Sequence, residues 1–392
     1  MTSEMNRKSF LKLMGLGVVT AATTKKTMAS TLSHLQSDEV MFYVGTYTTG
    51  KSKGIYRCTF SPSTGNISME GFTEGIVNPS FLTIAPDNKY LYAVSETDKY
   101  EGETSGSVDA YKIDTGTGGL EHLNKRPSHG AAPCFIITSN DGRYVMVANY
   151  NSGNLAVFPV AKDGSLGRIT DLVQHHGSGV NPERQEGPHA HSIVLDPANK
   201  FALSCDLGTD KVMIYKFDHE HGKLITASQP FAKVKPGLGP RHVKFHPSGR
   251  IVYVICEMGN TMLVFDYNPE NGHLKQKQLI STLPSDFHGT TDAAELQISS
   301  DGRFLYGSNR GADSIVVYSI NQKSGEITPV QYQSTLGKFP RHFILDPTEK
   351  YLIAANEHTN NVVVFNRDQN SGKITPAGKS IDIPDPVCIK FL

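Results

Sequence analysis

Charged side chains recur at two equivalent positions of a repeated segment, and their types suit anion binding and proton transfer. The residues at these two positions include His191, Arg241, Arg341, Glu96, Glu257, Arg310 and Glu357. Guanidinium groups hold a carboxylate, a phosphate or an oxyanion with two parallel hydrogen bonds, and carboxylates and imidazoles act as general acids and bases. Because the neighbouring strand residues are apolar, this charged set predicts a polar pocket for a small anionic ligand.

The repeated segment that aligns these residues is a polar turn followed by a strand. A basic residue in each turn marks the repeats, at Lys89, Arg143, Lys200, Arg250, Arg303 and Lys350. The gaps between them are 54, 57, 50, 53 and 47 residues. A period near 50 with several short strands per unit is typical of β-propellers. Helical solenoids have shorter periods and lack such Asp-Gly and Pro-Asp turns.

Each repeat is expected to form four strands, and the two ends of the chain supply parts of one shared blade. The first strand-two segment, 42–46, has no inner strand before it, and the last segment, Val387–Leu392, is an inner strand with nothing after it. The C-terminal strand can therefore pair with the N-terminal blade and remove the exposed sheet edges. We predict an all-β fold, a seven-bladed β-propeller closed by this pairing, as one domain over residues 41–392.

The register of the repeats places the charged set at one mouth of the predicted channel. Inner strands line the channel of a propeller, and the second strand of each blade runs antiparallel to the first. The start of the inner strand and the end of the second strand therefore emerge at the same mouth. There we expect His191, Arg241, Glu257 and Arg310 to meet.

Purely structural roles remain open for part of this set. Arg241 and Arg341 could serve only as salt-bridge partners of Glu257 and Glu357, between blades. His191 could be a channel histidine whose hydrogen bonds are satisfied within the fold. Either arrangement would leave these side chains without a role in ligand binding.

Other histidines offer a metal site or a surface position. His189 and His191 could be zinc ligands, because alternate residues of a strand share one face. A third ligand could come from Asp292, Glu295 or His242. The histidines in polar loops or hairpins are expected on the surface: His175, His176, His219 and His221. The favoured interpretation needs no metal and no other cofactor.

Composition excludes several classes of protein. The chain has 38 Lys and Arg against 38 Asp and Glu, so it lacks the basic excess of a protein that binds nucleic acid or a membrane surface. Its five cysteines are odd in number, mostly lie in apolar runs and show no CxxC spacing, which predicts buried thiols. A chain of this length can bury a sizeable core without disulfides.

The N-terminus has the pattern of an export signal. A polar-basic segment at 6–12 precedes an apolar run at 13–22 and small residues at 27–29. We interpret residues 1–30 as a signal peptide, twin-arginine-like with lysine in place of the second arginine, and 31–40 as a linker. The mature chain, which has no membrane span, is expected to be exported to the periplasm, or to stay in the cytoplasm if the signal is unused.

Several motifs resemble a known family. They are Gly239-Pro240-Arg241-His242-Val243-Lys244-Phe245-His246-Pro247, His191-Ser192, Asp206-Leu207-Gly208-Thr209-Asp210 and Ser308-Asn309-Arg310. Together with Glu257, they resemble the seven-bladed lactonase family, which includes the propeller-type 6-phosphogluconolactonase and the fungal carboxy-muconate lactonising enzyme. The resemblance spans nearly everything from Phe42 to Leu392. It implies a hydrolase that opens a sugar-acid lactone without a metal.

The resemblance also implies roles for residues of the charged set. Glu257 or His191 would activate a water, and the other would handle the proton of the leaving group. Arg241 and Arg310 would hold the substrate oxygens and the developing negative charge. We expect substrate binding by Arg341, His342, His242 and Glu295.

The substrate and two other functional classes stay open at this stage. An exported enzyme would act on a small anionic or polyhydroxylated lactone that need not carry a phosphate. A muconate-type cycloisomerase would use the same residues to move a proton without hydrolysis. A non-catalytic propeller would hold a ligand at its mouth, because a fold alone does not define a function.

Overall fold

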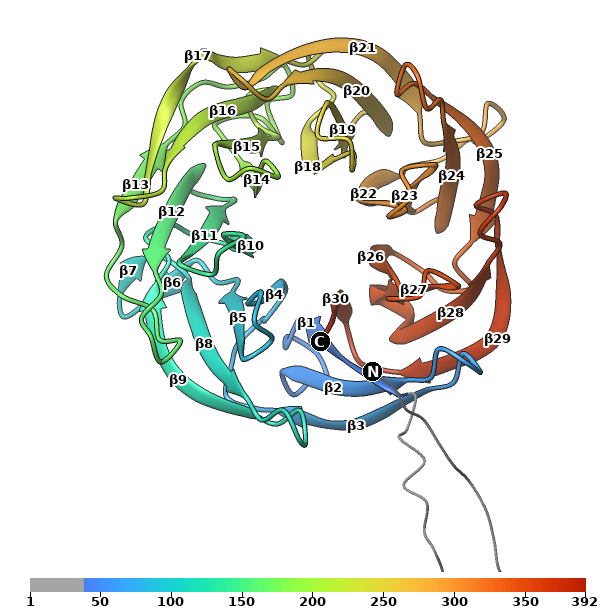
Figure 1. Ribbon diagram of the computed structural model, residues 1–392, viewed down its shortest axis with the longest axis horizontal. Helices are drawn as coiled ribbons and strands as arrows, with labels where there is room; N and C mark the ends of the chain where they lie inside the picture. The colour runs from blue at the N-terminus through green and yellow to red at the C-terminus, as the bar shows by residue number, and fades with distance from the viewer. Residues whose placement is uncertain (1–38) are drawn as a thin grey trace, which may run out of the picture. The chain divides into compact units, whose positions relative to one another are not determined.

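The computed structural model describes residues 39–392, which form a ring of seven four-stranded antiparallel sheets, or blades (Figure 1). A two-stranded hairpin adds β6 (Lys99–Tyr100) and β7 (Glu103–Thr104), and the helical element in this range is the short 3-10 helix η1 (Glu357–Thr359). The all-β, seven-bladed prediction is confirmed. The predicted signal peptide, residues 1–30, lies outside the described residues, as does the 31–40 linker up to residue 38.

The strands of each blade follow one another from the inner to the outer edge (Figure 1). Blade 1 contains β30 (Pro386–Phe391), β1 (Val40–Thr46), β2 (Ile55–Phe60) and β3 (Ile67–Thr73). Blade 2 contains β4 (Leu82–Ile84), β5 (Tyr90–Ser95), β8 (Ser107–Ile113) and β9 (Leu120–Pro127). Blade 3 contains β10 (Pro133–Thr138), β11 (Tyr144–Asn149), β12 (Asn154–Pro159) and β13 (Asp171–Gln174).

The other four blades repeat this order. Blade 4 contains β14 (Ala190–Leu195), β15 (Phe201–Asp206), β16 (Lys211–Asp218) and β17 (Lys223–Lys233). Blade 5 contains β18 (Pro240–Phe245), β19 (Ile251–Cys256), β20 (Thr261–Asn268) and β21 (His273–Ser281). Blade 6 contains β22 (Asp292–Ile298), β23 (Phe304–Arg310), β24 (Ser314–Ile320) and β25 (Ile327–Ser334), and blade 7 contains β26 (Pro340–Leu345), β27 (Tyr351–Asn356), β28 (Asn361–Arg367) and β29 (Ile374–Asp382).

The two ends of the described chain close the ring in blade 1. The C-terminal strand β30 pairs antiparallel with β1, with Val44 opposite Ile389. The ring of Phe391 lies 5.5 Å from that of Phe42 and 6.0 Å from that of Phe60, between centroids. The predicted closure is therefore confirmed, and it covers the inner edge of β1.

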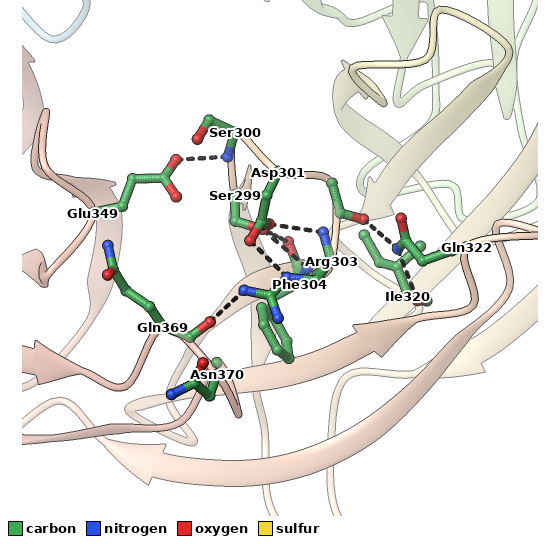
Figure 2. Close-up of polar contacts among 12 residues, drawn as sticks. Ser299, Ser300, Asp301, Arg303, Phe304, Ile320, Gln322, Glu349, Gln369 and Asn370 are labelled. Carbon is green, nitrogen blue, oxygen red and sulfur yellow. Dashed lines mark hydrogen bonds and ion pairs between the residues drawn. The ribbon is translucent and has the colours of Figure 1, made fainter.

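The turn that marks each repeat also ties neighbouring blades together. In blade 6, Arg303 Nε binds Asp301 Oδ2 at 2.7 Å, and its NH2 group donates to the carbonyl oxygen of Gln369 in blade 7 at 2.7 Å (Figure 2). In return, Glu349 of blade 7 accepts a hydrogen bond from the amide of Ser300 at 2.6 Å (Figure 2). The polar turn that recurs along the sequence thus forms a contact between blades.

Apolar packing fills the space between the blades. The second strand of a blade is buried on both faces, as in β11, where every residue is buried. The core groups join side chains of adjacent blades, for example Leu203 of blade 4 with Val254 of blade 5. All five cysteines are buried free thiols, as predicted. None of the helical structure in residues 39–392 is long and apolar enough to cross a membrane.

Candidate functional site

Irregular starts of the inner strands position the predicted site residues. The pairing of β14 with β15 skips from Ala190 to Ser192, and the pairing of β18 with β19 skips from Pro240 to His242. The pairing of β26 with β27 skips the corresponding residue in the same way. The skipped residues are His191, Arg241 and Arg341. Because a β-bulge bends its strand and redirects a side chain, these bulges explain why the second residue of these three inner strands belongs to the site.

Glu257 is the centre of the cluster. It follows β19, and its amide donates to the carbonyl oxygen of Gly239 at 2.8 Å. Its Oε2 atom lies 3.0 Å from Arg241 Nε and 2.8 Å from Arg310 NH2. Its Oε1 atom lies 2.5 Å from Arg184 NH2. Three guanidinium groups therefore hold one buried carboxylate, and the Arg241–Glu257 pair forms within blade 5 rather than between blades.

The charge of Glu257 follows from these neighbours. Burial acts to raise the pKa of Glu257, but Arg310, Arg241 and the other nearby cations outweigh burial and hold that pKa well below its usual range. Glu257 is therefore an ionised carboxylate at neutral pH, with little tendency to take up a proton.

His191 lies beside this carboxylate and, unlike Glu257, is uncharged at neutral pH. Its Nε2 atom is 3.8 Å from Glu257 Oε2, and its Nδ1 atom is 3.7 Å from Cys134 Sγ. Burial, followed by the positive charge of Arg241, lowers the pKa of His191 well below its usual value. The imidazole is therefore neutral at neutral pH, so one ring nitrogen has a lone pair that can accept a proton.

Arg184 is the site residue that the sequence analysis missed. It lies in the loop 175–189 between β13 and β14, and its side chain keeps 38% of its surface exposed, against 3% for Arg241. The buried side chain of Gln185 anchors this loop, because its Nε2 donates to the carbonyl oxygen of Leu207 at 2.9 Å. A long connection in a repeat of short turns was the available signal, since such loops often carry function.

Arg341 is held at the mouth by another set of partners. Its NH2 group donates to the hydroxyl of Tyr47 at 2.8 Å, and the guanidinium lies over the Tyr47 ring at 5.3 Å. The Tyr47 hydroxyl in turn donates to Glu96 Oε2 at 3.0 Å. Glu357, the partner expected for Arg341, makes no ion pair with it in the described part of the chain. Burial raises the pKa of Glu357, and Arg341 opposes this shift.

His242, Glu295 and His342 lie one residue further along the inner strands and contact one another. His242 Nδ1 is 2.9 Å from Glu295 Oε2, and His342 Nε2 is 3.7 Å from the same oxygen. The rings of Phe81 and Phe135, stacked at 4.4 Å, pack beside both histidines. These residues form the next layer of the channel. Substrate contact by His242, Glu295 and His342 therefore stays a prediction.

One of the two histidines of the zinc alternative, His189, has partners within the fold. His189 Nδ1 lies 3.0 Å from the carbonyl oxygen of Tyr150, and its Nε2 lies 3.1 Å from Glu186 Oε1. Both ring nitrogens of His189 are thus already bonded within the fold. Across residues 39–392, no three His, Cys, Asp or Glu side chains are grouped so that they could hold a metal ion.

The surface position expected for His175 is wrong. His175 is only 2% exposed, and its Nδ1 atom lies 2.7 Å from Asp206 Oδ2. Asp206 Oδ1 also accepts hydrogen bonds from the amides of His189 and Thr209, at 2.9 and 3.0 Å. The loop folds back onto the end of β15, and this contact buries the ring. His176, the next residue, is exposed as predicted.

The fold and the site define a class of protein: a seven-bladed propeller in which arginines hold a buried carboxylate beside a neutral histidine. The chain belongs to the family described as lactonase, 7-bladed beta-propeller, whose sequence model matches residues 41–391. The resemblance stated from the motifs is therefore confirmed.

Individual relatives agree with this assignment. The 6-phosphogluconolactonase of Bacillus subtilis (strain 168) is 39% identical over 351 residues, which cover 89% of this chain and 97% of that protein. A 6-phosphogluconolactonase of Formosa agariphila is 34% identical over 313 residues, with 79% and 87% covered. The solved structure of the periplasmic gluconolactonase PpgL of Pseudomonas aeruginosa has a TM-score of 0.84 and 34% identity, over 90% of this chain and 99% of that one.

Proposed function

We propose that this protein hydrolyses the ring ester of a sugar-acid lactone. The observation that carries the proposal is the buried imidazole of His191, 3.8 Å from a carboxylate that Arg241 and Arg310 hold. This arrangement places a base beside two guanidinium groups. Ester hydrolysis needs a base to activate the water and positive charge or hydrogen-bond donors to stabilise the oxyanion. The names of the relatives from Bacillus subtilis and Pseudomonas aeruginosa support the same reaction class.

His191 carries the proton in this proposal. It removes a proton from a water molecule whose oxygen attacks the carbonyl carbon of the lactone. When the ester C–O bond breaks, the imidazolium returns this proton to the ring oxygen, which becomes the hydroxyl group of the open hydroxy acid. Glu257 does not act as the general acid, because it carries no proton to give at neutral pH.

The arginines stabilise the negative charge that develops on the carbonyl oxygen. Arg310 Nε is buried and has no hydrogen-bond partner among the described residues. Buried donors are normally paired, so an unpaired one beside the site is suited to a reacting oxygen. Glu257 holds Arg310 and Arg241 in place while leaving this N–H group available.

The proposal extends to the substrate class. Arg184 and Arg341 flank the Glu257 cluster and would bind the polar end of the lactone, a hydroxyl group or a phosphate. Guanidinium pairs suit a phosphate, and two relatives are named 6-phosphogluconolactonase. The cycloisomerase alternative is disfavoured, because these relatives are named as lactonases.

Hydrolysis can be tested with the purified full chain. Glucono-δ-lactone and 6-phosphoglucono-δ-lactone would be assayed at mildly acidic pH, where spontaneous opening is slow, and the hydroxy acid would be detected by NMR. We expect turnover above the uncatalysed rate for at least one lactone, and strong loss of turnover in His191→Asn. His176→Ala, which changes an exposed side chain in the loop 175–189, is the control. Wild-type protein that opens neither lactone would contradict the proposal.

Export is a separate part of the proposal. The basic, apolar and small-residue order of residues 1–30 supports it, as does the periplasmic relative from Pseudomonas aeruginosa. Protein isolated from its native host should lack about the first 29 residues by intact-mass analysis. A full-length mass in the cytosol would refute export.

A further inference from the structure

Two identical triplets flank blade 6 in the channel. Pro240-Arg241-His242 begins the inner strand of blade 5, and Pro340-Arg341-His342 begins that of blade 7. Glu295 lies between them on β22 of blade 6, and both histidines approach its Oε2 atom, at 2.9 and 3.7 Å. Glu295 is only 2% exposed, so the two histidines meet a carboxylate that water barely reaches.

The hydrogen bonds determine which nitrogen of His242 carries the proton. A carboxylate only accepts, so Nδ1, at 2.9 Å from Glu295 Oε2, must be the donor. Arginine only donates, and Arg241 NH1 lies 3.1 Å from Nε2 and 3.3 Å from Nδ1 of His242. Because Nδ1 already carries a proton, Nε2 is the ring nitrogen that keeps a lone pair. Nε2 of His242 must therefore be the acceptor. Burial, followed by Arg241, lowers the pKa of His242 well below its usual value, which agrees with a neutral ring.

A continuous chain of hydrogen bonds results. Arg241 donates through Nε to Glu257 Oε2 at 3.0 Å and through NH1 to His242, and His242 donates to Glu295. Every link has one donor and one acceptor. The chain begins in the layer below the mouth and ends at the carboxylate beside His191.

Glu295 itself is held from several sides. Its Oε1 accepts from Gln297 Nε2 at 3.2 Å, and its amide donates to Ser308 Oγ at 3.1 Å. His342 accepts the amide of Ile389 at Nδ1, at 3.3 Å, so the proton of His342 is on Nε2, which lies 3.7 Å from Glu295 Oε2 and makes no hydrogen bond within the described residues. The carboxylate is therefore fixed in position before any substrate arrives.

Two lysines complete the charged surroundings of Glu295. Burial lowers the pKa of Lys244, and Glu295 opposes that shift. Lys390 Nζ lies 4.7 Å from the ring centroid of Phe81. Neither lysine makes an ion pair with Glu295 within the described residues, so the two histidines are its closest ionisable partners.

We propose that Glu295 is a positioning residue for the hydrolysis: it holds His242 as the Nδ1–H tautomer, and His242 Nε2 then holds Arg241 against Glu257. Without the acceptor at Glu295, His242 can move its proton to Nε2 and point a donor at Arg241. Arg241 NH1 would then keep the carbonyl oxygen of Ala294, at 2.7 Å, but would face a donor on His242, and the guanidinium would shift from the developing negative charge. This inference rests on the proposed function.

Graded substitutions of Glu295 separate positioning from a structural role. Glu295→Met removes the acceptor and should lower kcat roughly 10- to 100-fold with little change in KM, since small displacements of a catalytic group cost this much. Glu295→Gln keeps an acceptor oxygen and should recover most of that loss. Asp196→Asn is the matched control, a buried carboxylate that binds the amides of Lys200 and Phe201 in a turn, and it should keep kcat unchanged.

A double variant keeps the test decisive if a single variant fails to fold. Glu295→Met with His242→Phe replaces the buried pair by apolar groups, which is often nearly neutral for folding. Its kcat should fall no further than that of the worse single variant, because both residues act through Arg241. Additive losses, unchanged kcat in the double variant, or equal losses in Glu295→Gln and Glu295→Met would overturn the proposal.

The tautomer of His242 provides a readout that does not depend on activity. In ¹⁵N-histidine-labelled wild-type protein, the His242 signal, identified by its loss in His242→Phe, should be that of the Nδ1–H form. In Glu295→Met it should change toward the Nε2–H form. An Nε2–H signal in the wild type would overturn the positioning role. Absence of lactone turnover with the expected tautomers would instead refute the proposed function alone.

Discussion

His191 Nε2 and Glu257 Oε2 lie 3.8 Å apart, yet the surroundings of the two side chains shift their pKa values so that only one of them carries charge at neutral pH. Arginines outnumber carboxylates around the pair, and they favour the ionised glutamate and the neutral histidine alike. His191 and Glu257, both candidates for proton transfer by residue type, thus have different roles. The histidine can accept a proton, and the carboxylate holds the arginines.

The first prediction concerns the pH dependence of turnover. The pKa of His191 is lowered, so its neutral form persists as the pH falls below about 6.5, where an ordinary histidine becomes charged. kcat/KM should therefore stay level through that region and fall only as the pH passes the lowered pKa. The measurement is a pH profile corrected for spontaneous opening of the lactone. A decline of kcat/KM centred near an ordinary histidine pKa would show that the base is not a His191 with a lowered pKa.

The second prediction concerns the coupling of the two residues. His191→Asn and Glu257→Gln should each lower kcat by roughly 10²–10⁴, the first by removing the base and the second by releasing the arginines. The double variant should cost little more than the worse single change, because the groups serve one step. Steady-state kinetics of the three variants is the measurement. Near wild-type kcat in the double variant would remove both residues from the mechanism.

The third prediction concerns Arg184. Its guanidinium binds Glu257 Oε1 at 2.5 Å and is the most exposed of the three around that carboxylate, so it is the one that a substrate anion reaches first. Arg184→Met should raise KM for 6-phosphoglucono-δ-lactone at least about 10-fold, the scale of one lost charge-assisted contact. KM for the unphosphorylated lactone should change less.

Two further variants control the Arg184 experiment. Arg184→Lys should restore only part of the affinity, because an ammonium group cannot make the two-pronged contact. Arg168→Met removes an exposed arginine elsewhere on the surface and should leave both KM values unchanged. Equal increases of KM for both lactones would argue against recognition of a phosphate by Arg184.

The fourth prediction compares two adjacent histidines. His175→Ala removes the partner of buried Asp206 and should lower the free energy of unfolding by about 1–3 kcal/mol, the cost of an unsatisfied buried acceptor. His176→Ala changes an exposed side chain and should leave stability unchanged. Urea denaturation of both variants provides the comparison. Equal stability of the two variants would mean that the contact of His175 with Asp206 contributes nothing.

The fifth prediction concerns ring closure. Deletion of Val387–Leu392 removes β30, so it exposes the inner edge of β1 and an unpaired face of blade 7. The truncated protein should melt at a lower temperature and associate, as followed by size-exclusion chromatography and thermal denaturation. Phe391→Ala, which keeps the strand but removes a ring packed on Phe42, should destabilise without association. A monomeric truncated protein with an unchanged melting temperature would contradict closure by this strand.

The blades were predictable from the sequence because their determinants are local. The polar turns before Arg143, Arg303 and the other basic residues recur at a regular period, and each turn specifies where a strand begins. Once seven strand starts are known, antiparallel pairing requires His191, Arg241, Glu257 and Arg310 to gather at one mouth. The fold, its closure and the presence of these four residues at the mouth therefore followed from spacing, whereas Arg184 did not.

Only the tertiary structure decided how these side chains act on one another. The bulges at the starts of β14 and β18, which lie at His191 and Arg241, depend on pairing register that no local pattern specifies. The loop 175–189 has no periodicity, so neither the burial of His175 nor the approach of Arg184 to Glu257 was visible in the sequence. The charge states of His191 and Glu257 depend on burial and on cations from several blades. Electrostatic energy depends on distance through space, and positions along the chain do not contain that distance until the ring has closed.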